Sequence, residues 1–439
     1  MTVLVFAQII GTVGVGVAPS IGILLAGAVT NSEAWAGLAR TASTLGAALL
    51  GLPLGTLAAR RGRRAALAGG WWTAAAGGAV LVAAAQWSMI VPLFAGLLLI
   101  GAGLAVSLQS RFAATDLAQP HHKARSLALV VWVGTLGSVL GPNLGAPGEI
   151  IGTATGLTVY ASAFLIAAVC LAIAGLIVWV WLRPDPLLFL GQTTPASPAG
   201  PGGRRQGRIR QVLAELRVNQ RARVAVVAIL TAQAVMVAIM TMTPVHVTHQ
   251  GGSITIVGIT ISLHIVGMYA PAPLVGLIAD GYGHRSAISA GLGILAVSLV
   301  IGAVKPDDTG WIITSLILLG IGWSFVNVAG SALFNAVVST ETRASSQGGV
   351  DALSNFCGAT AAFAAGPLLA AGSFSLLSVL ALIALVPLTI LMAGRALTPP
   401  ERVNRTPSGR RHRPGPTVSA CSSEGRRTCR LPPLSTTSS

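Results

Sequence analysis

Long apolar stretches follow one another along most of the chain, and they constrain its fold more than any other feature. Each is about 20 residues long, the length that an α-helix needs to cross the hydrocarbon core of a bilayer. We expect twelve spans, over residues 3–29, 35–58, 65–85, 89–110, 126–146, 157–182, 224–247, 254–279, 286–304, 311–338, 348–370 and 374–397. The chain is 53% hydrophobic and only 9% charged, which a soluble core does not require. The pattern predicts an all-α membrane protein.

Basic residues test this division into spans, because Lys and Arg concentrate in cytoplasmic loops. They follow the second, fourth, eighth and tenth spans, at Arg60, Arg61, Arg63, Arg64, Arg111, Lys123, Arg125, Arg285 and Arg343. The opposite loops hold Lys305 as their only Lys or Arg. The charges therefore predict a multi-pass protein of the plasma membrane with both termini in the cytoplasm. They also account for the net charge of +16, and no basic domain with interleaved aromatic residues points to nucleic acid.

The spans divide into two sets of six. We expect residues 1–183 to form the first six-helix bundle and residues 224–397 the second. Residues 184–223 between them are rich in Pro, Gly and Arg, which predicts a cytoplasmic linker. Residues 398–439 have no apolar period and are expected to form a disordered basic tail in the cytoplasm, with some attraction to anionic lipid.

Two basic loops echo each other in the two halves. Gly55, Arg60, Gly62, Arg63 and Arg64 follow the second span, and Gly276, Asp280, Gly283 and Arg285 follow the eighth. Gly62 and Gly283 suit a tight reversal between helices, and the cations suit the cytoplasmic face. Basic inside loops without a further role are the alternative interpretation.

These loops resemble the signature Gly-x-x-x-Asp-Arg-x-Gly-Arg-Arg of the major facilitator superfamily. The resemblance implies two six-helix bundles that rock around a central substrate site near the bilayer midplane. In that family the aspartate docks on a helix N-terminus of the other half and helps to close one face. By resemblance, Asp280 should cap the start of the fifth span. The first copy departs from the pattern, because Ala59 stands at the aspartate position.

The fifth span carries Gly137, Gly141, Pro142 and Gly145. They resemble the GxxxGPxxG motif of proton-coupled drug antiporters in the same superfamily. Three glycines on about one helical face permit close helix contact, and the proline bends the helix and frees a carbonyl. Generic packing is the alternative, because GxxxG pairs are common in membranes. The resemblance implies efflux in exchange for protons.

Three ionisable residues lie deep inside the predicted spans, so each is a functional candidate. Asp351 shares a stripe of i,i+4 spacing with Arg343, Gln347 and Asn355, which we expect to face a cavity. A buried carboxylate can bind and release a proton, which makes Asp351 the preferred coupling residue. Its alternative role is a fixed partner of an arginine on the cytoplasmic side. His264 suits a proton relay, a substrate hydrogen bond or an ordinary interhelical contact.

Arg40 is the third ionisable candidate and lies in the outer third of the second span. It could attract an anionic substrate or lock an outer gate, and it is too far along the membrane normal to pair directly with Asp351. By resemblance to the family, the other candidates for the substrate cavity are Gln8, Gln109, Gln233, Trp323, Asn327 and Asn355.

The expected function is secondary active transport by a monomer without a cofactor. We expect proton-coupled efflux of a small, partly hydrophobic solute. An uptake symporter for a nutrient is the first alternative, and a transport-inactive membrane sensor or scaffold is the second. The sequence has no phosphate loop, metal-ligand spacing or nucleophile triad, so we expect neither an enzyme, nor a metal site, nor ATP-driven transport.

Overall fold

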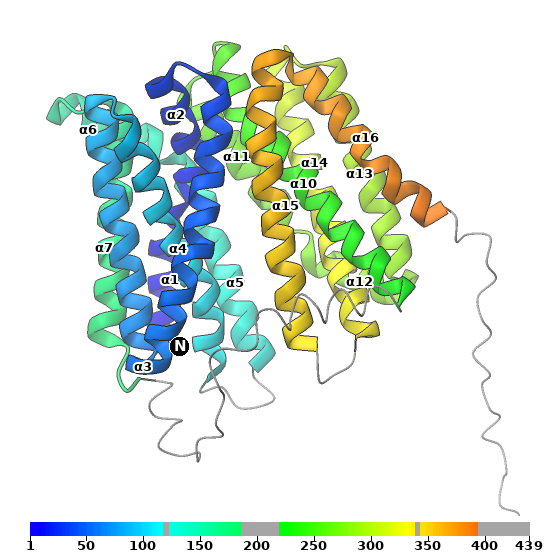
Figure 1. The fold of residues 1–439 in the computed structure, drawn as a ribbon, viewed down its shortest axis with the longest axis horizontal. Helices are drawn as coiled ribbons and strands as arrows, with labels where there is room; N and C mark the ends of the chain where they lie inside the picture. The colour runs from blue at the N-terminus through cyan, green and yellow to red at the C-terminus, as the bar shows by residue number, and fades with distance from the viewer. Residues whose placement is uncertain (117–122, 186–218, 339–342, 394–439) are drawn as a thin grey trace, which may run out of the picture. The chain divides into compact units, whose positions relative to one another are not determined.

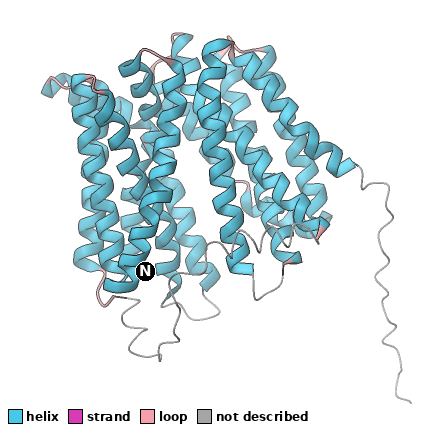
Figure 2. Cartoon of the chain, viewed as in Figure 1, coloured by secondary structure: helices cyan, strands magenta, loops and turns pink. Residues whose placement is uncertain are grey.

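A computed structural model describes residues 1–116, 123–185, 219–338 and 343–393 (Figure 1). Every regular element in these ranges is a helix (Figure 2), which confirms the expected all-α fold. Residues 186–218 of the predicted linker and the whole predicted tail lie outside the described ranges.

The helices of the two halves have the following bounds. The N-terminal half contains α1 (Thr2–Gly16), the π-helical turn η1 (Ala18–Gly22), α2 (Ile23–Thr30), α3 (Glu33–Trp87), α4 (Ile90–Asp116), α5 (Lys123–Leu140), the 3-10 turn η3 (Gly141–Leu144), α6 (Gly145–Thr155) and α7 (Val159–Trp181). The C-terminal half contains α10 (Gln220–His249), α11 (Ile254–Tyr269), α12 (Ala272–Tyr282), α13 (His284–Val304), α14 (Thr309–Val337), α15 (Arg343–Ala371) and α16 (Phe374–Ala393).

Helix α3 contains both the second and the third expected span, because the chain doubles back at Gly62. A straight helix of 55 residues would extend about 80 Å, far beyond a hydrocarbon core of about 30 Å. Gly62 has a φ of 89°, a conformation that glycine adopts readily because it has no Cβ. Leu54 before the bend packs against Gly70 after it. The reversal expected at Gly62 is therefore present.

Ten described segments are long and apolar enough to cross a membrane, whereas twelve were expected. One of the ten is α3, which covers two expected spans. The fifth expected span, which α5, η3 and α6 divide near Pro142, is not among the ten segments found in the described residues. Proline lacks the N–H that would continue the helical ladder, so the chain tightens into a 3-10 turn there. The count of twelve spans stays a prediction.

Buried apolar side chains separate into clusters that follow the two halves. The largest cluster consists almost wholly of residues from α10 to α16, and two smaller clusters consist mostly of residues from α1 to α7. Trp71 and Phe164 are fully buried in the N-terminal half, and Phe334 and Phe374 in the C-terminal half. Each half is therefore packed around a core of its own.

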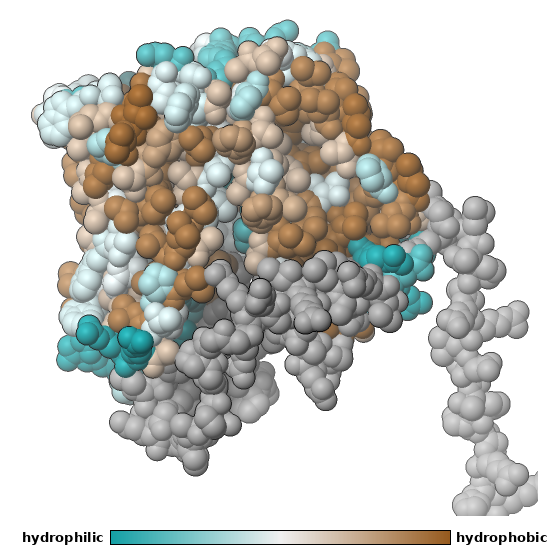
Figure 3. All heavy atoms as spheres, viewed as in Figure 1, coloured by the Kyte–Doolittle hydropathy of each residue, from teal (hydrophilic) through white to brown (hydrophobic). Residues whose placement is uncertain are grey.

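Large apolar side chains also remain exposed along the helices. Ile150 is 72% exposed, Leu277 70% and Ile390 66%. Figure 3 shows hydrophobic residues across the middle of the visible face and hydrophilic residues toward its upper and lower rims. Such a surface suits hydrocarbon as its solvent, with polar groups near the headgroups.

Glycine brings the helices of each half close together, as expected where lipid supplies no hydrophobic force between helices. Gly46 of α3 lies against the carbonyl of Leu98 in α4, and Gly101 of α4 lies against the carbonyl of Ser43 in α3. A Cβ at either glycine would collide with backbone atoms of the other helix. The contact between α3 and α4 therefore depends on both glycines.

Replacing Gly46 by Val should destabilise the fold, because the added side chain would collide with the Leu98 carbonyl. Overpacking of this kind costs about 1–3 kcal/mol. The measurement is the thermal unfolding midpoint of the purified protein in detergent. Gly293→Ala on α13 is the matched control, since a Cβ there meets nothing within 4 Å. Equal midpoints for the two variants would contradict this account of the packing.

Candidate functional site

Two ends of the helices must be distinguished to describe the site. Following the charge pattern, we call the end that holds Glu33 and Ala371 the outer end, and the end that holds Gly62 and Gly283 the inner end. The labelled N-terminus and the bend of α3 lie together at the lower, inner side of Figure 1.

The two halves contact each other at the outer end through α3 and α15. Thr41 Oγ1 donates a hydrogen bond of 3.0 Å to the carbonyl oxygen of Ala359. One turn further out, Gly37 lies against the carbonyl of Ala362. Gly366 in turn lies against the carbonyl of Ala34. Small residues thus bring the two backbones together.

A second contact joins the fifth span to α11. Asn143 Nδ2 donates to Ser262 Oγ at 2.7 Å, and Ser262 Oγ donates to the Val139 carbonyl at 2.6 Å. Gly258 of α11 lies against the carbonyl of Pro142, which is the carbonyl of the residue expected to bend this span. Gly145 lies against the side chain of Ile254. The outer half of the fifth span is therefore part of the contact between the halves.

The glycines of the antiporter-like motif divide between two partners. Gly137 lies against Thr12 and Gly141 against Gly16, both on α1 in the same half. Gly145 faces the other half, as described above. Close contact between helices therefore accounts for the glycines of this motif.

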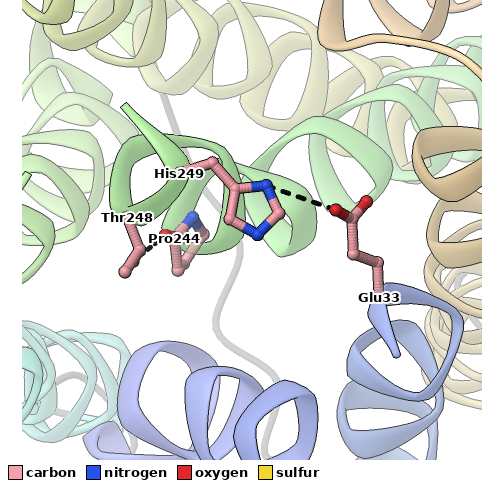
Figure 4. Close-up of polar contacts among 4 residues, drawn as sticks. All are labelled: Glu33, Pro244, Thr248 and His249. Carbon is pink, nitrogen blue, oxygen red and sulfur yellow. Dashed lines mark hydrogen bonds and ion pairs between the residues drawn. The ribbon is translucent and has the colours of Figure 1, made fainter. Parts of the chain in front are cut away.

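An ion pair also bridges the halves at the outer end. His249 Nδ1 at the end of α10 lies 3.2 Å from Glu33 Oε1 at the start of α3 (Figure 4). Both side chains are partly or largely exposed. The pair carries opposite charges only when His249 is protonated. Sequence reasoning did not find this pair, because the two residues are distant in sequence and no local pattern connects them.

Toward the inner end, the face of α15 that meets α3 is exposed. Asp351 lies eleven residues, or about three turns, before Ala362 and therefore on the same helical face. Asn355 lies on this face as well, since eleven residues separate it from Gly366. Asp351 and Asn355 are exposed, whereas Ala362 and Gly366 are buried. The described contacts between α3 and α15 therefore lie at the outer end, whereas this face of α15 is exposed toward the inner end.

Asp280 on α12 is also exposed toward the inner end. Its side chain is exposed and forms no hydrogen bond or ion pair with the residues that the structure describes. The side chains at the start of the fifth span lie outside the described part of the structure, so the cap that the resemblance implies stays a prediction. Such a cap requires the inner ends of the two halves to meet.

A carboxylate that was not predicted from the sequence, Asp185, binds the reversal of α3 at Gly62. Asp185 accepts hydrogen bonds from the backbone N–H groups of Arg63 at 3.1 Å and Arg64 at 2.8 Å. It follows α7 and lies at the positive end of the helix that begins after Gly62. Its signal in the sequence is a single acidic residue directly after the sixth span.

The basic residues of the loop motifs lie at the inner end. The Arg64 guanidinium lies 4.3 Å from the Trp179 ring centroid, and Arg285 donates to the Met392 carbonyl at 3.0 Å. Gly283 has a φ of 91° and forms the reversal of the second copy. Arg60 is exposed, and a Cβ at Gly55 or Gly276 would meet nothing within 4 Å.

A cluster of polar and aromatic side chains lies near the middle of the span where the halves face each other. It consists of Arg40, Gln233, Tyr269 and Trp323, which we call the central cluster. Arg40 of α3 is within electrostatic range of Tyr269 of α11. The rings of Tyr269 and Trp323 meet edge to face with centroids 6.2 Å apart, and Trp323 Nε1 donates to Gln233 Oε1 at 2.9 Å. All four side chains are partly accessible.

The side chain of His264 is packed inside the C-terminal half and does not face a cavity. It is fully buried, and its Nδ1 lies 2.7 Å from the Leu316 carbonyl of α14. Arg40 lies within electrostatic range of it. The interhelical role considered from the sequence is the one that this hydrogen bond supports.

The remaining sequence candidates do not join the central cluster. Gln8 Nε2 donates to Ser107 Oγ at 2.5 Å, and Gln109 Nε2 donates to the Gly51 carbonyl at 3.2 Å. Both contacts lie within the N-terminal half. Asn327 is partly accessible on α14. The side chains of Arg343 and Gln347, which the predicted polar stripe includes, lie outside the described part of the structure.

A pocket of about 560 Å³ opens at the outer end. Glu149, Tyr160 and Ser253 contribute its polar groups, and Leu25 and Ile254 line it as well. It contains none of the site residues expected from the sequence. Among the described residues, no three His, Cys, Asp or Glu side chains are close enough to hold a metal ion.

The sequence matches a known protein family. The sequence profile of the Major Facilitator Superfamily matches residues 3–270 and 224–435. The chain belongs to this superfamily. An MFS-type transporter of Bacillus subtilis (strain 168), YddS, which is described as uncharacterized, is 36% identical over 380 residues, 86% of each chain. The riboflavin transporter RfnT of Brucella anthropi is 27% identical over 371 residues, 84% of this chain and 88% of that protein.

Solved structures of the major facilitator fold resemble this one. The nucleoside transporter NupG has a TM-score of 0.66 at 15% identity, covering 90% of this chain and 98% of that one. A bacterial homolog of the human lysosomal transporter Spinster, inward-facing and occupied, has a TM-score of 0.67 at 14% identity, covering 89% of this chain and 94% of that one. The protein is therefore a multi-pass membrane transporter of the major facilitator type.

Replacing Gly37 by Ala should weaken closure at the outer end of this major facilitator protein, because the new Cβ would collide with the Ala362 carbonyl. We expect the population with an open outer end to rise about fivefold or more, since overpacking costs about 1–3 kcal/mol. Glu33→Gln should raise it by about fivefold at most, as an exposed ion pair contributes about 0.2–1 kcal/mol. Electron-spin distances between labels on the exposed residues Thr153 and Thr314 measure the two populations.

Gly27→Ala is the matched control for this experiment. A Cβ at Gly27 meets nothing within 4 Å, so the distance distribution should stay that of the parent protein. An unchanged distribution in Gly37→Ala would show that the contact between α3 and α15 does not hold the outer end closed.

Proposed function

We propose that this transporter exports a small, partly hydrophobic solute in exchange for protons, by alternating access. The observation that carries the proposal is the position of Asp351. It lies on the face of α15 that meets α3 further out, and the residue is exposed. When the inner ends close, this face is covered. A carboxylate that passes between water and a closed interface can gain and lose a proton during the cycle.

The packing of the fifth span connects the antiporter-like motif to movement of the halves. The motif that resembles proton-coupled antiporters joins α1 within its half to α11 in the other half, through Gly141 and Gly145. Rocking of the halves must therefore change the surroundings of this span. Efflux is proposed from the resemblance of the motif, and the contact gives that motif a mechanical part in the cycle.

The side chains of the central cluster support a partly hydrophobic solute. Tyr269 and Trp323 offer aromatic surface, and Gln233 and Arg40 offer hydrogen-bond donors. Such a site suits a solute with a flat apolar part and a few polar groups. RfnT is named as a riboflavin transporter, and riboflavin is a reasonable first probe on these grounds.

Asp351→Asn should abolish transport driven by a pH gradient, because the amide cannot carry a proton. Solute exchange without a gradient should persist, since the substitution keeps the size of the side chain. The measurement uses proteoliposomes with an imposed pH gradient and a panel of small aromatic solutes that includes riboflavin. We expect gradient-driven flux to fall to the level of empty liposomes.

Asp307→Asn is the matched control, because Asp307 lies in an outer loop and accepts a hydrogen bond from Gln250. It should transport like the parent protein. Gradient-driven flux that survives in Asp351→Asn would overturn the coupling role. Movement of solute and protons in the same direction would instead identify an uptake symporter.

A further inference from the structure

We infer that Arg40 forms the anion-binding part of the substrate site, and that the transported solute is an aromatic or heteroaromatic monoanion with a carboxylate or similar planar acidic group. The inference rests on the proposed transport function and names its class of substrate. It begins from the position of Arg40 in the fold and from the charges around it.

Arg40 lies where a substrate would meet both halves. It stands seven residues after Glu33, which places it about 10 Å below the outer end of α3. Its neighbour Thr41 donates to Ala359 of α15, so the helix is in contact with the other half at this level. Across the interface, Arg40 is within electrostatic range of Tyr269. The guanidinium therefore lies between the halves, at the inner edge of the outer closure.

The charge of Arg40 has no counter-ion among the described residues. Its side chain forms no hydrogen bond or ion pair with any of them, and the ion pair between Glu33 and His249 lies further out on the same helix. The single described carboxylate deep within the spans, Asp351, lies roughly 12 Å nearer the inner end, judged from its distance along α15 to Ala359. A lone cation at this depth is costly unless a partner neutralises it.

The nitrogens of Arg40 are open to a ligand. None of them is among the described buried polar atoms that lack a partner, and the side chain is partly accessible. Each nitrogen therefore keeps some accessible surface. The planar guanidinium offers paired N–H donors in the geometry that a carboxylate accepts.

The surroundings of the guanidinium define the rest of the ligand. The edge-to-face pair of Tyr269 and Trp323 supplies aromatic surface, and the bond from Trp323 to Gln233 fixes the indole in place. One cation calls for one negative charge, because His264 is buried against the Leu316 carbonyl and does not add a second exposed cation. An aromatic monoanion satisfies both parts of the site.

Binding to the purified full-length protein in detergent tests the inference without any gradient. The probes are 2-naphthoate, its neutral isostere 2-naphthamide, and inorganic phosphate, in low-chloride buffer. We expect 2-naphthoate to bind at least about tenfold more tightly than 2-naphthamide, since a charge-assisted bidentate contact is stronger than a neutral one. Equal affinities, or stabilisation by phosphate or chloride equal to that by 2-naphthoate, would overturn the inference.

Three variants separate a binding role from a structural one. Arg40→Gln should lose the preference for the anion, Arg40→Lys should keep part of it, and Arg221→Gln, which removes an exposed cation at the start of α10, should keep all of it. Without ligand, Arg40→Gln should unfold at the same or a higher temperature, because an unpaired charge is removed. A lower unfolding temperature that Arg40→Lys restores would show a structural cation and overturn the inference.

The outcome is independent of proton coupling. Anion binding that depends on Arg40 in a protein without gradient-driven flux would leave the inference standing and refute the proposed coupling. Gradient-driven flux without a preference for anions would refute the inference about Arg40 and leave the proposed coupling standing.

Discussion

Close approach of helix backbones is the constraint on which the rest of the structure depends. In hydrocarbon, apolar side chains gain nothing by leaving their solvent, so helices associate where small residues let them touch. Gly46 and Gly101 do this within the N-terminal half, and Gly37 and Gly366 do it between the halves. The contacts within a half are extensive along the helices, whereas the contacts between α3 and α15 described above lie toward the outer end. A transporter needs this difference, because its halves must separate without losing their own cores.

The position of the outer closure also decides which polar groups are accessible. Along the interface of α3 and α15, the sequence of features from outside inward is the Glu33 pair, the glycine contact at Gly37, then Arg40, and finally Asp351. The closure thus lies directly outside the cation, and the carboxylate lies on the open side. An anionic solute bound at Arg40 would be shielded from the outside and in communication with the inner end. The same geometry gives Asp351 contact with water on the inner side only.

The sequence predicted those features that depend on local patterns. The length of the apolar stretches and the alternation of charge predicted a helical membrane protein. Gly62 predicted the reversal within α3. Both predictions depend only on residues that are close together in the sequence. Pro142 indicated a bend, and the structure has a 3-10 turn at that point. The depth of Arg40 marked it as a candidate, because an arginine within a span is rare. Trp323 was a cavity candidate by resemblance to the family, whereas Tyr269 was not predicted, since its position depends on how α11 rotates toward the other half.

The two loop motifs differ in a way that the packing explains in part. The first copy has Ala59 where the family has an aspartate, yet a carboxylate is present nearby, because Asp185 binds the backbone N–H groups of Arg63 and Arg64. This contact joins α3 to the end of α7 within one half, so it stabilises the loop without linking the halves. The second copy keeps Asp280, which is exposed and free to meet the other half when the inner ends close. Inner closure should therefore rely more on the second loop than on the first, because only there is a motif carboxylate available to a helix N-terminus of the opposite half.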